Sequence, residues 1–129
     1  MSSIRTAAVL VILAVIITGI SMANKPNDVT DPSITVSPSM LVLSRYVAAV
    51  TVNTNIKGSM DVKDVCLYRT KNGISGAIQP YETFTDAMGY LVAKFNAEAV
   101  KYIVKIGTVE LTLETTDGFI ASDTIRVKN

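Results

Sequence analysis

The chain of 129 residues contains no histidine and no tryptophan, and it has a single cysteine, Cys66. Without histidine it lacks the side chain that most often serves as general base, proton shuttle and metal ligand. A single cysteine excludes an internal disulfide and a zinc site built from several cysteines. A Cys–His catalytic pair is excluded as well. These absences disfavour an enzyme, and we expect no catalytic residue in this chain.

The first strongly patterned segment is hydrophobic. Residues 7–20 carry no charge, Arg5 precedes them, and the small residues Ser21 and Ala23 follow. A basic start, an apolar stretch and a small-residue exit are typical of a secretory signal peptide, here over residues 1–23. The uncharged run is also close to the length of a membrane-spanning helix, so a retained anchor is the alternative. Both interpretations predict that residues 24–129 are exported to the cell surface or beyond it.

The charge of the exported part is balanced. The whole chain has 12 basic and 11 acidic residues, and one basic residue, Arg5, belongs to the signal segment. The remaining net charge of zero gives no electrostatic footprint for nucleic acid or for an anionic membrane. We therefore expect no nucleic-acid partner, and membrane contact only through residues 7–23 if these are not removed.

Short apolar runs separated by turn residues follow the signal segment. Residues 24–33 are polar, contain two prolines and are expected to form a flexible lead-in. Residues 34–36 alternate apolar and polar side chains until Pro38 interrupts them, which predicts an edge strand. Further strands are expected over 46–56, 62–70, 90–95, 109–113 and 119–127, a short strand over 74–78 and a loop over 80–89.

One helix is expected outside the signal segment. Residues 97–104 follow Asn96, a good N-cap residue, and precede Gly107, where a C-cap glycine would stand. About seven short strands and one short helix predict an all-β domain over residues 34–129. The economical architecture is an antiparallel β-sandwich of immunoglobulin type, held by core burial without a disulfide.

The order and spacing of several segments point to a particular family. They are residues 91–95, 99–100, 107–113 and 117–118, with Ser122-Asp123-Thr124-Ile125-Arg126-Val127 as the most specific piece. The sequence resembles an immunoglobulin-like module that recurs in secreted and cell-surface proteins of archaea and anaerobic bacteria, often beside dockerin-type modules. The resemblance spans about residues 34–128. It implies a non-enzymatic accessory or surface-display role and transfers no catalytic residue.

The chain departs from that family in one loop. Such modules usually carry an acidic, calcium-holding loop before the strand that corresponds to residues 91–95. Here the matching residues 81–90 offer only the carboxylates of Glu82 and Asp86. Calcium takes six to eight oxygen ligands, so two carboxylates are a weak candidate metal site. We expect no cofactor, and calcium binding is the disfavoured alternative.

The remaining reactive side chains have structural explanations. Cys66 is expected to be a buried strand residue, and the alternative is a disulfide between two copies of the exported chain. Asp61 and Asp64 are expected in a solvated loop, since a glycosidase pair needs a cleft. Asp123 and Arg126 are expected to make a structural contact in the last strand.

The sequence therefore predicts an exported, non-catalytic domain that acts in cell-surface structure, adhesion or protein–protein association, with another protein or its own copies as partner. One alternative is a filament or surface-array subunit, in which Ile34, Thr35 and Val36 add as a strand to a neighbour's sheet. Another is a carbohydrate-binding module, which the absence of tryptophan disfavours.

Overall fold

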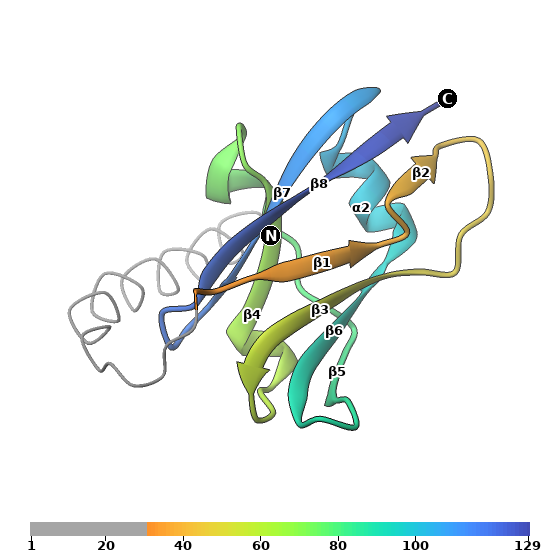
Figure 1. Ribbon diagram of the computed structural model, residues 1–129. Helices are drawn as coiled ribbons and strands as arrows, with labels where there is room; N and C mark the ends of the chain where they lie inside the picture. Colours follow the sequence, from red (N-terminus) through yellow and green to blue (C-terminus); the bar gives the residue numbers. More distant parts are fainter. Residues whose placement is uncertain (1–30) are drawn as a thin grey trace.

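The computed structural model describes residues 31–129, so the predicted signal segment over residues 1–23 and most of the predicted lead-in lie outside the described residues. The described chain forms two four-stranded sheets (Figure 1). One sheet has the order β1 (Ile34–Ser37), β3 (Ala49–Lys57), β6 (Tyr90–Asn96), β5 (Glu82–Thr85). The other has the order β2 (Met40–Val42), β8 (Ile120–Lys128), β7 (Gly107–Thr115), β4 (Val65–Arg69). This part of the chain has one α-helix, α2 (Ala97–Ile103), so the prediction of a mostly β fold with one short helix is confirmed.

The hydrophobic core lies between the two sheets. Alternate side chains of β3 and β6 point inward, including Val50, Val52 and Phe95, all at most 1% exposed. Leu111 and Leu113 of β7, both fully buried, complete the core from the other sheet. Burying one such side chain contributes about 1.5–3 kcal/mol, so burial between the sheets is the main favourable contribution to their packing.

The chain changes sheets at Pro38. Before it, β1 runs antiparallel to β3 at the edge of the first sheet; after it, β2 runs parallel to β8 at the edge of the second. Proline has no backbone N–H to donate to a ladder, and the peptide bond Ser37–Pro38 is cis. The prediction of an interrupted edge strand at this position is confirmed.

The predicted strand over residues 74–78 is wrong. A 3-10 turn, η3 (Gly73–Gly76), occupies most of that segment. Only Ile78 pairs with β4, exchanging backbone hydrogen bonds of 2.8 and 2.9 Å with Leu67. The turn begins at Gly73, whose φ of 68° suits glycine, and it packs Ile74 against the outer side of β4.

The predicted loop over residues 80–89 is wrong in part, because it contains the strand β5. Buried and exposed side chains do not alternate along β5, so its sequence carries no strand pattern.

The C-terminal end of the helix also differs from the prediction. The helix begins as predicted, because the Asn96 side chain accepts hydrogen bonds from the N–H groups of Glu98 and Ala99. It ends at Ile103 with Val104 as C-cap, so Gly107 does not cap it and instead opens β7. The φ of 122° at Gly107 explains the glycine there.

The sandwich has two distinct ends. We call one the hairpin end: it comprises the start of β1 and the loops 58–64, 86–89 and 116–119. Gly58 N–H donates to Gly89 O (2.9 Å) and Thr116 N–H donates to Asp64 O (3.0 Å), which joins the loops of both sheets. The opposite α2 end comprises the loop 43–48, α2, residues 104–106, and the ends of β4 and β8 (Figure 1).

Candidate functional site

A small buried cluster lies on the outer side of β4 and β7. Cys66 and Glu114 are partners in the register of these strands, and both are almost fully buried. The Tyr68 hydroxyl donates to Glu114 Oε1, while Glu114 Oε2 has no donor among residues 31–129. Ile74 and Ala77, in and just after η3, cover the cluster.

The thiol and the phenol of this cluster are neutral near neutral pH, because the pKa of each is raised. Burial, with the nearby Glu114 charge as a smaller cause, raises the pKa of the Cys66 thiol from 9.0 to about 12. Burial and the hydrogen bond to Glu114 raise the pKa of the Tyr68 phenol above its ordinary 10.0. Only a thiolate is a good nucleophile, so Cys66 is a poor one. Its side chain is 1% exposed, so a disulfide between copies requires this region to open.

The two carboxylates of the weak metal-site prediction lie on different elements. Glu82 is exposed on β5, and Asp86 lies in the turn after it. Asp86 Oδ1 accepts hydrogen bonds from the N–H groups of Met88 (2.8 Å) and Tyr90 (3.0 Å), so it holds its own turn. Nowhere in residues 31–129 do three or more side chains form a metal-binding group.

Asp123 makes a structural contact between the sheets. Its Oδ2 on β8 accepts a hydrogen bond of 2.8 Å from the backbone N–H of Val36 on β1. Arg126 contributes its backbone, donating to Ser39 O at 2.8 Å. The other acidic pair lies at the hairpin end, where Asp61 is the exposed N-cap of the 3-10 turn η2 (Val62–Asp64) and the half-buried Asp64 is its last residue.

The predicted strand-addition segment is paired within its own domain. Ile34, Thr35 and Val36 form β1 and pair with β3. The side chains of Ile34 and Val36 are 8% and 2% exposed. Because Asp123 already accepts from Val36 N–H, one backbone donor on the free edge of β1 is occupied.

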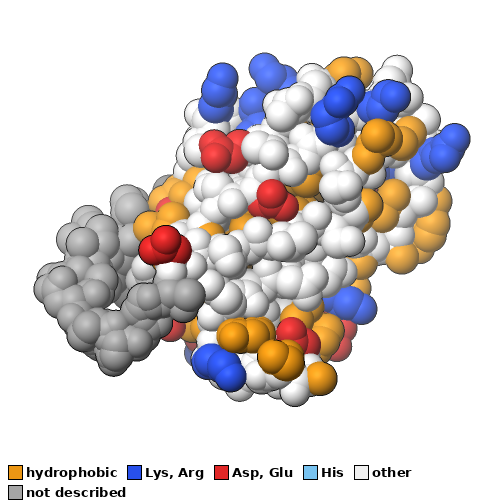
Figure 2. All heavy atoms as spheres, in the orientation of Figure 1, with side chains coloured by type: hydrophobic (Ala, Val, Ile, Leu, Met, Phe, Trp, Pro, Cys, Tyr) orange, Lys and Arg blue, Asp and Glu red, His pale blue; other side chains and the backbone are white. Residues whose placement is uncertain are grey.

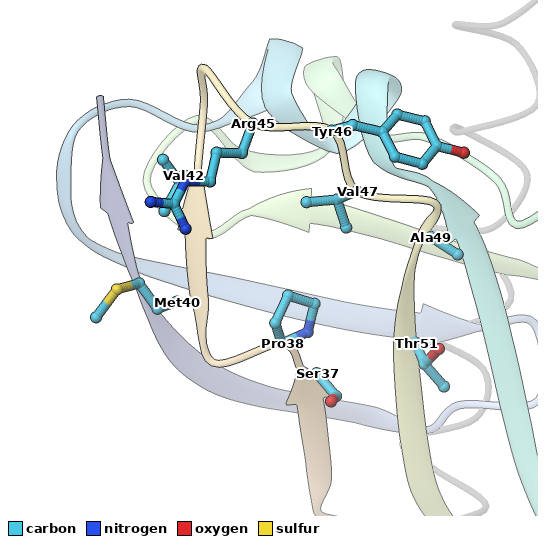
Figure 3. Close-up of a pocket in the computed structure, with 9 residues that line it drawn as sticks. All are labelled: Ser37, Pro38, Met40, Val42, Arg45, Tyr46, Val47, Ala49 and Thr51. Carbon is cyan, nitrogen blue, oxygen red and sulfur yellow. The ribbon is translucent and has the colours of Figure 1, made fainter.

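The α2 end carries an open hollow of about 510 Å³ beside Pro38 (Figure 3). Pro38 and Val47 point toward one another across it, whereas Met40 points outward from its rim. Tyr46 on the same loop is 87% exposed. The Lys101 ammonium of α2 donates to Leu43 O (3.1 Å) and Arg45 O (2.8 Å), and these bonds hold the loop against the helix.

Large side chains are unusually exposed at this end. Tyr102 of α2 is 89% exposed, and Ile106 just after the helix is 61% exposed. With Tyr46 of the loop 43–48, we call these residues the tyrosine surface. Sequence reasoning missed it, although a signal exists: Ala97 and Val100 are the buried residues of α2, and Tyr102 lies off that face. Aromatic residues such as tyrosine are enriched in protein interfaces relative to the rest of the surface.

No protein-family model matches the chain, and no curated protein matches it. None of the helices within residues 31–129 has the length and apolarity needed to cross a membrane.

Proposed function

We propose that the chain is an exported, non-catalytic immunoglobulin-like domain that acts by protein–protein association at the cell surface. The observation that carries the proposal is the tyrosine surface, with Tyr46 and Tyr102 almost fully exposed at one end of a rigid sandwich. Tyrosine offers a large contact area and a polar hydroxyl at low entropic cost, which is why interfaces are rich in it.

The strand order supports the immunoglobulin type. If β2 is counted as the continuation of β1 in the second sheet, the domain has seven strands. The first sheet then has the order first, second, fifth, fourth, and the second sheet joins the third, sixth and seventh. This is the arrangement of constant-type immunoglobulin domains.

The proposal that the domain is exported rests on the hydrophobic residues 7–20 and on the small residues that follow them.

The experiment measures binding of the fluorescently labelled exported protein to intact cells of the source organism. Replacing Tyr46 and Tyr102 together by serine should weaken binding at least tenfold, since hot-spot aromatics dominate interface energies. Tyr81→Ser is the matched control, because Tyr81 is 55% exposed but lies outside the tyrosine surface. If the double variant binds as well as the unchanged protein, the tyrosine surface is not the binding site and the proposal fails.

The position of β1 at a sheet edge favours a second candidate, assembly into a filament by strand addition. In that case β1 must leave β3 of its own domain and pair with a neighbour. Deleting residues 24–37 should then abolish polymers, while polymers of unchanged length would reject this candidate. The carbohydrate-binding alternative stays a prediction, and a glycan array without any bound sugar would remove it.

A further inference from the structure

The charges of the domain are separated along its long axis. Five of the ten acidic residues in the described chain lie at the hairpin end, where only two basic residues accompany them. The acidic residues are Asp31, Asp61, Asp64, Asp86 and Asp117, and the basic ones are Lys57 and Lys63. The backbone hydrogen bonds between these loops hold them together at this end. The hairpin end is therefore a negatively charged surface.

The α2 end has the opposite charge. It holds seven of the ten basic residues of the described chain and only two acidic ones, Glu98 and Glu110. The basic residues are Arg45, Arg69, Lys71, Lys101, Lys105, Arg126 and Lys128. Figure 2 shows Lys and Arg side chains gathered along the upper side of the molecule, the side on which Figure 1 places α2 and the C-terminus.

Few of these charges are neutralised within the domain. Lys101–Glu98, with an N–O distance of 3.3 Å, is the single ion pair among residues 31–129. Three acidic residues lie between the two ends: Asp123 holds β1, Glu114 is buried against Tyr68, and Glu82 is exposed on β5. The separated end charges thus remain available to solvent or to a partner.

We propose that copies of this domain associate head to tail, with the basic α2 end of one copy against the acidic hairpin end of the next. This inference rests on the proposed function and names its partner as a second copy. Opposite potentials steer the two ends together and disfavour contacts between like ends. The net charge of the exported part is zero, so there is no overall repulsion between copies.

Apolar side chains at both ends can form the centre of such a contact. The tyrosine surface lies among the basic residues of the α2 end. At the hairpin end, Met88 is 67% exposed and Ile120 is 38% exposed. An apolar centre with a charged rim is the usual anatomy of an interface. Because the two ends are different surfaces, the contact does not close on itself, and repeated addition gives an open filament unless the rotation forms a ring.

The test is sedimentation of the exported protein at increasing concentration and at two ionic strengths. We expect the average mass to rise with concentration at about 20 mM salt. At about 0.5 M salt the screening length falls to a few ångströms, and the protein should return to monomers. Strand-exchanged polymers would instead survive high salt, because main-chain hydrogen bonds and burial hold them, and that result would overturn the proposal.

Two charge-reversed variants test the polarity. Arg45→Glu with Lys71→Glu and Lys105→Glu changes the net charge of the α2 end from +5 to −1, so that both ends are acidic. Asp31→Lys with Asp61→Lys changes the net charge of the hairpin end from −3 to +1, so that both ends are basic. All five side chains are exposed and none makes a side-chain hydrogen bond in the described structure. Each variant alone should associate at least tenfold more weakly than the unchanged protein. Mixing the two should restore association, which also shows that both are folded.

Lys63→Glu is the matched control, because it reverses an exposed charge at the hairpin end in the direction that makes this end more acidic. It should associate as strongly as the unchanged protein or more strongly. Monomers at every concentration, or association that neither reversal weakens, would overturn head-to-tail assembly. The cell-binding experiment with Tyr46 and Tyr102 has a separate readout. Binding to cells by a protein that stays monomeric would leave the proposed function standing while this inference fails.

Discussion

The carboxylate of Asp123 on β8 accepts a hydrogen bond of 2.8 Å from the backbone N–H of Val36 on β1, so one side chain joins the edge of one sheet to a strand of the other. The contact spans 87 positions of the sequence. It fixes β1 where the chain is about to change sheets at Pro38, and it occupies a donor that an edge strand would otherwise present to solvent.

Replacing Asp123 by alanine should lower the free energy of unfolding by about 1–3 kcal/mol, because a backbone donor loses a charged acceptor. Asp123→Asn retains an oxygen in the same place and should lose less. Urea unfolding followed by circular dichroism measures both. Equal midpoints for the alanine variant and the unchanged protein would show that water replaces the carboxylate without cost.

Asn96 controls the start of α2. Its side-chain oxygen accepts hydrogen bonds from the N–H groups of Glu98 (2.8 Å) and Ala99 (3.3 Å). Asn96→Ala should lower stability by about 1 kcal/mol, whereas Asn96→Ser should keep most of it, since serine also caps. The urea midpoints of the two variants provide the comparison, and a serine variant as unstable as the alanine variant would contradict the capping role.

Strands with one buried face could be predicted from the sequence. In β8 the buried residues Ala121, Ile125 and Val127 alternate with exposed ones, and the Asp117-Gly118 pair marks the hairpin before it. The φ of 101° at Gly118 is the positive value such a turn requires. β7 and β8 pair without interruption from Gly107 to Glu114. Local pattern and tertiary burial agree here, so the prediction holds.

The segments that the sequence did not reveal depend on tertiary contacts. β5 has no buried face of its own; it is a strand because it pairs with β6 from Glu82 to Thr85 and because Thr83 Oγ1 donates to Met60 O (2.5 Å). Residues 73–76 became a 3-10 turn because Ile74 finds an apolar surface on β4. Alternation along one strand cannot report either contact.

The candidate surfaces were beyond sequence reasoning for a similar reason. The net charge of residues 24–129 is zero and is known from composition, but the separation into two ends depends on which loops share an end. Asp61, Asp86 and Asp117 are far apart in the sequence, and only the strand pairing places them together. Tyr46 and Tyr102 likewise lie at the same end of the fold, although they belong to two segments that are distant in the sequence.

Cys66 should react with thiol reagents only when the protein unfolds. A thiol pKa of about 12, against 9.0 for an exposed thiol, leaves about a thousandfold less thiolate at pH 8. Burial of the side chain slows the reaction further. Alkylation followed by mass spectrometry should be rapid in 8 M urea and at least a hundredfold slower without it.

The burial and the raised pKa of Cys66 also disfavour a disulfide between two copies of the chain. Protein kept folded under air should migrate as a monomer on a non-reducing gel, and Cys66→Ser should look the same. A dimer band from folded protein, absent in the serine variant, would show that the region around η3 opens readily and that the disulfide alternative is correct.

The buried Cys66 thiol and Tyr68 phenol should make the free energy of unfolding fall at high pH. Below pH 9 the Cys66 thiol is neutral in both the folded and the unfolded chain. Between pH 9 and about pH 12 the unfolded chain loses this proton while the folded chain keeps it, because the folded thiol pKa is raised to about 12. Stability must therefore decrease through this window, and the raised phenol pKa of Tyr68 adds to the decrease above pH 10.

Glu114→Gln keeps an oxygen that can accept from Tyr68 but removes the negative charge opposite Cys66. The thiol pKa should then fall while staying above 9.0, because burial is its larger cause. The decline should accordingly end at a lower pH in this variant than in the unchanged protein, and urea midpoints at pH 8, 10 and 11.5 measure this. Cys66→Ser, which cannot titrate here, should flatten the decline. Parallel declines in all three proteins would mean that other groups, and not this buried cluster, set the alkaline limit of the fold.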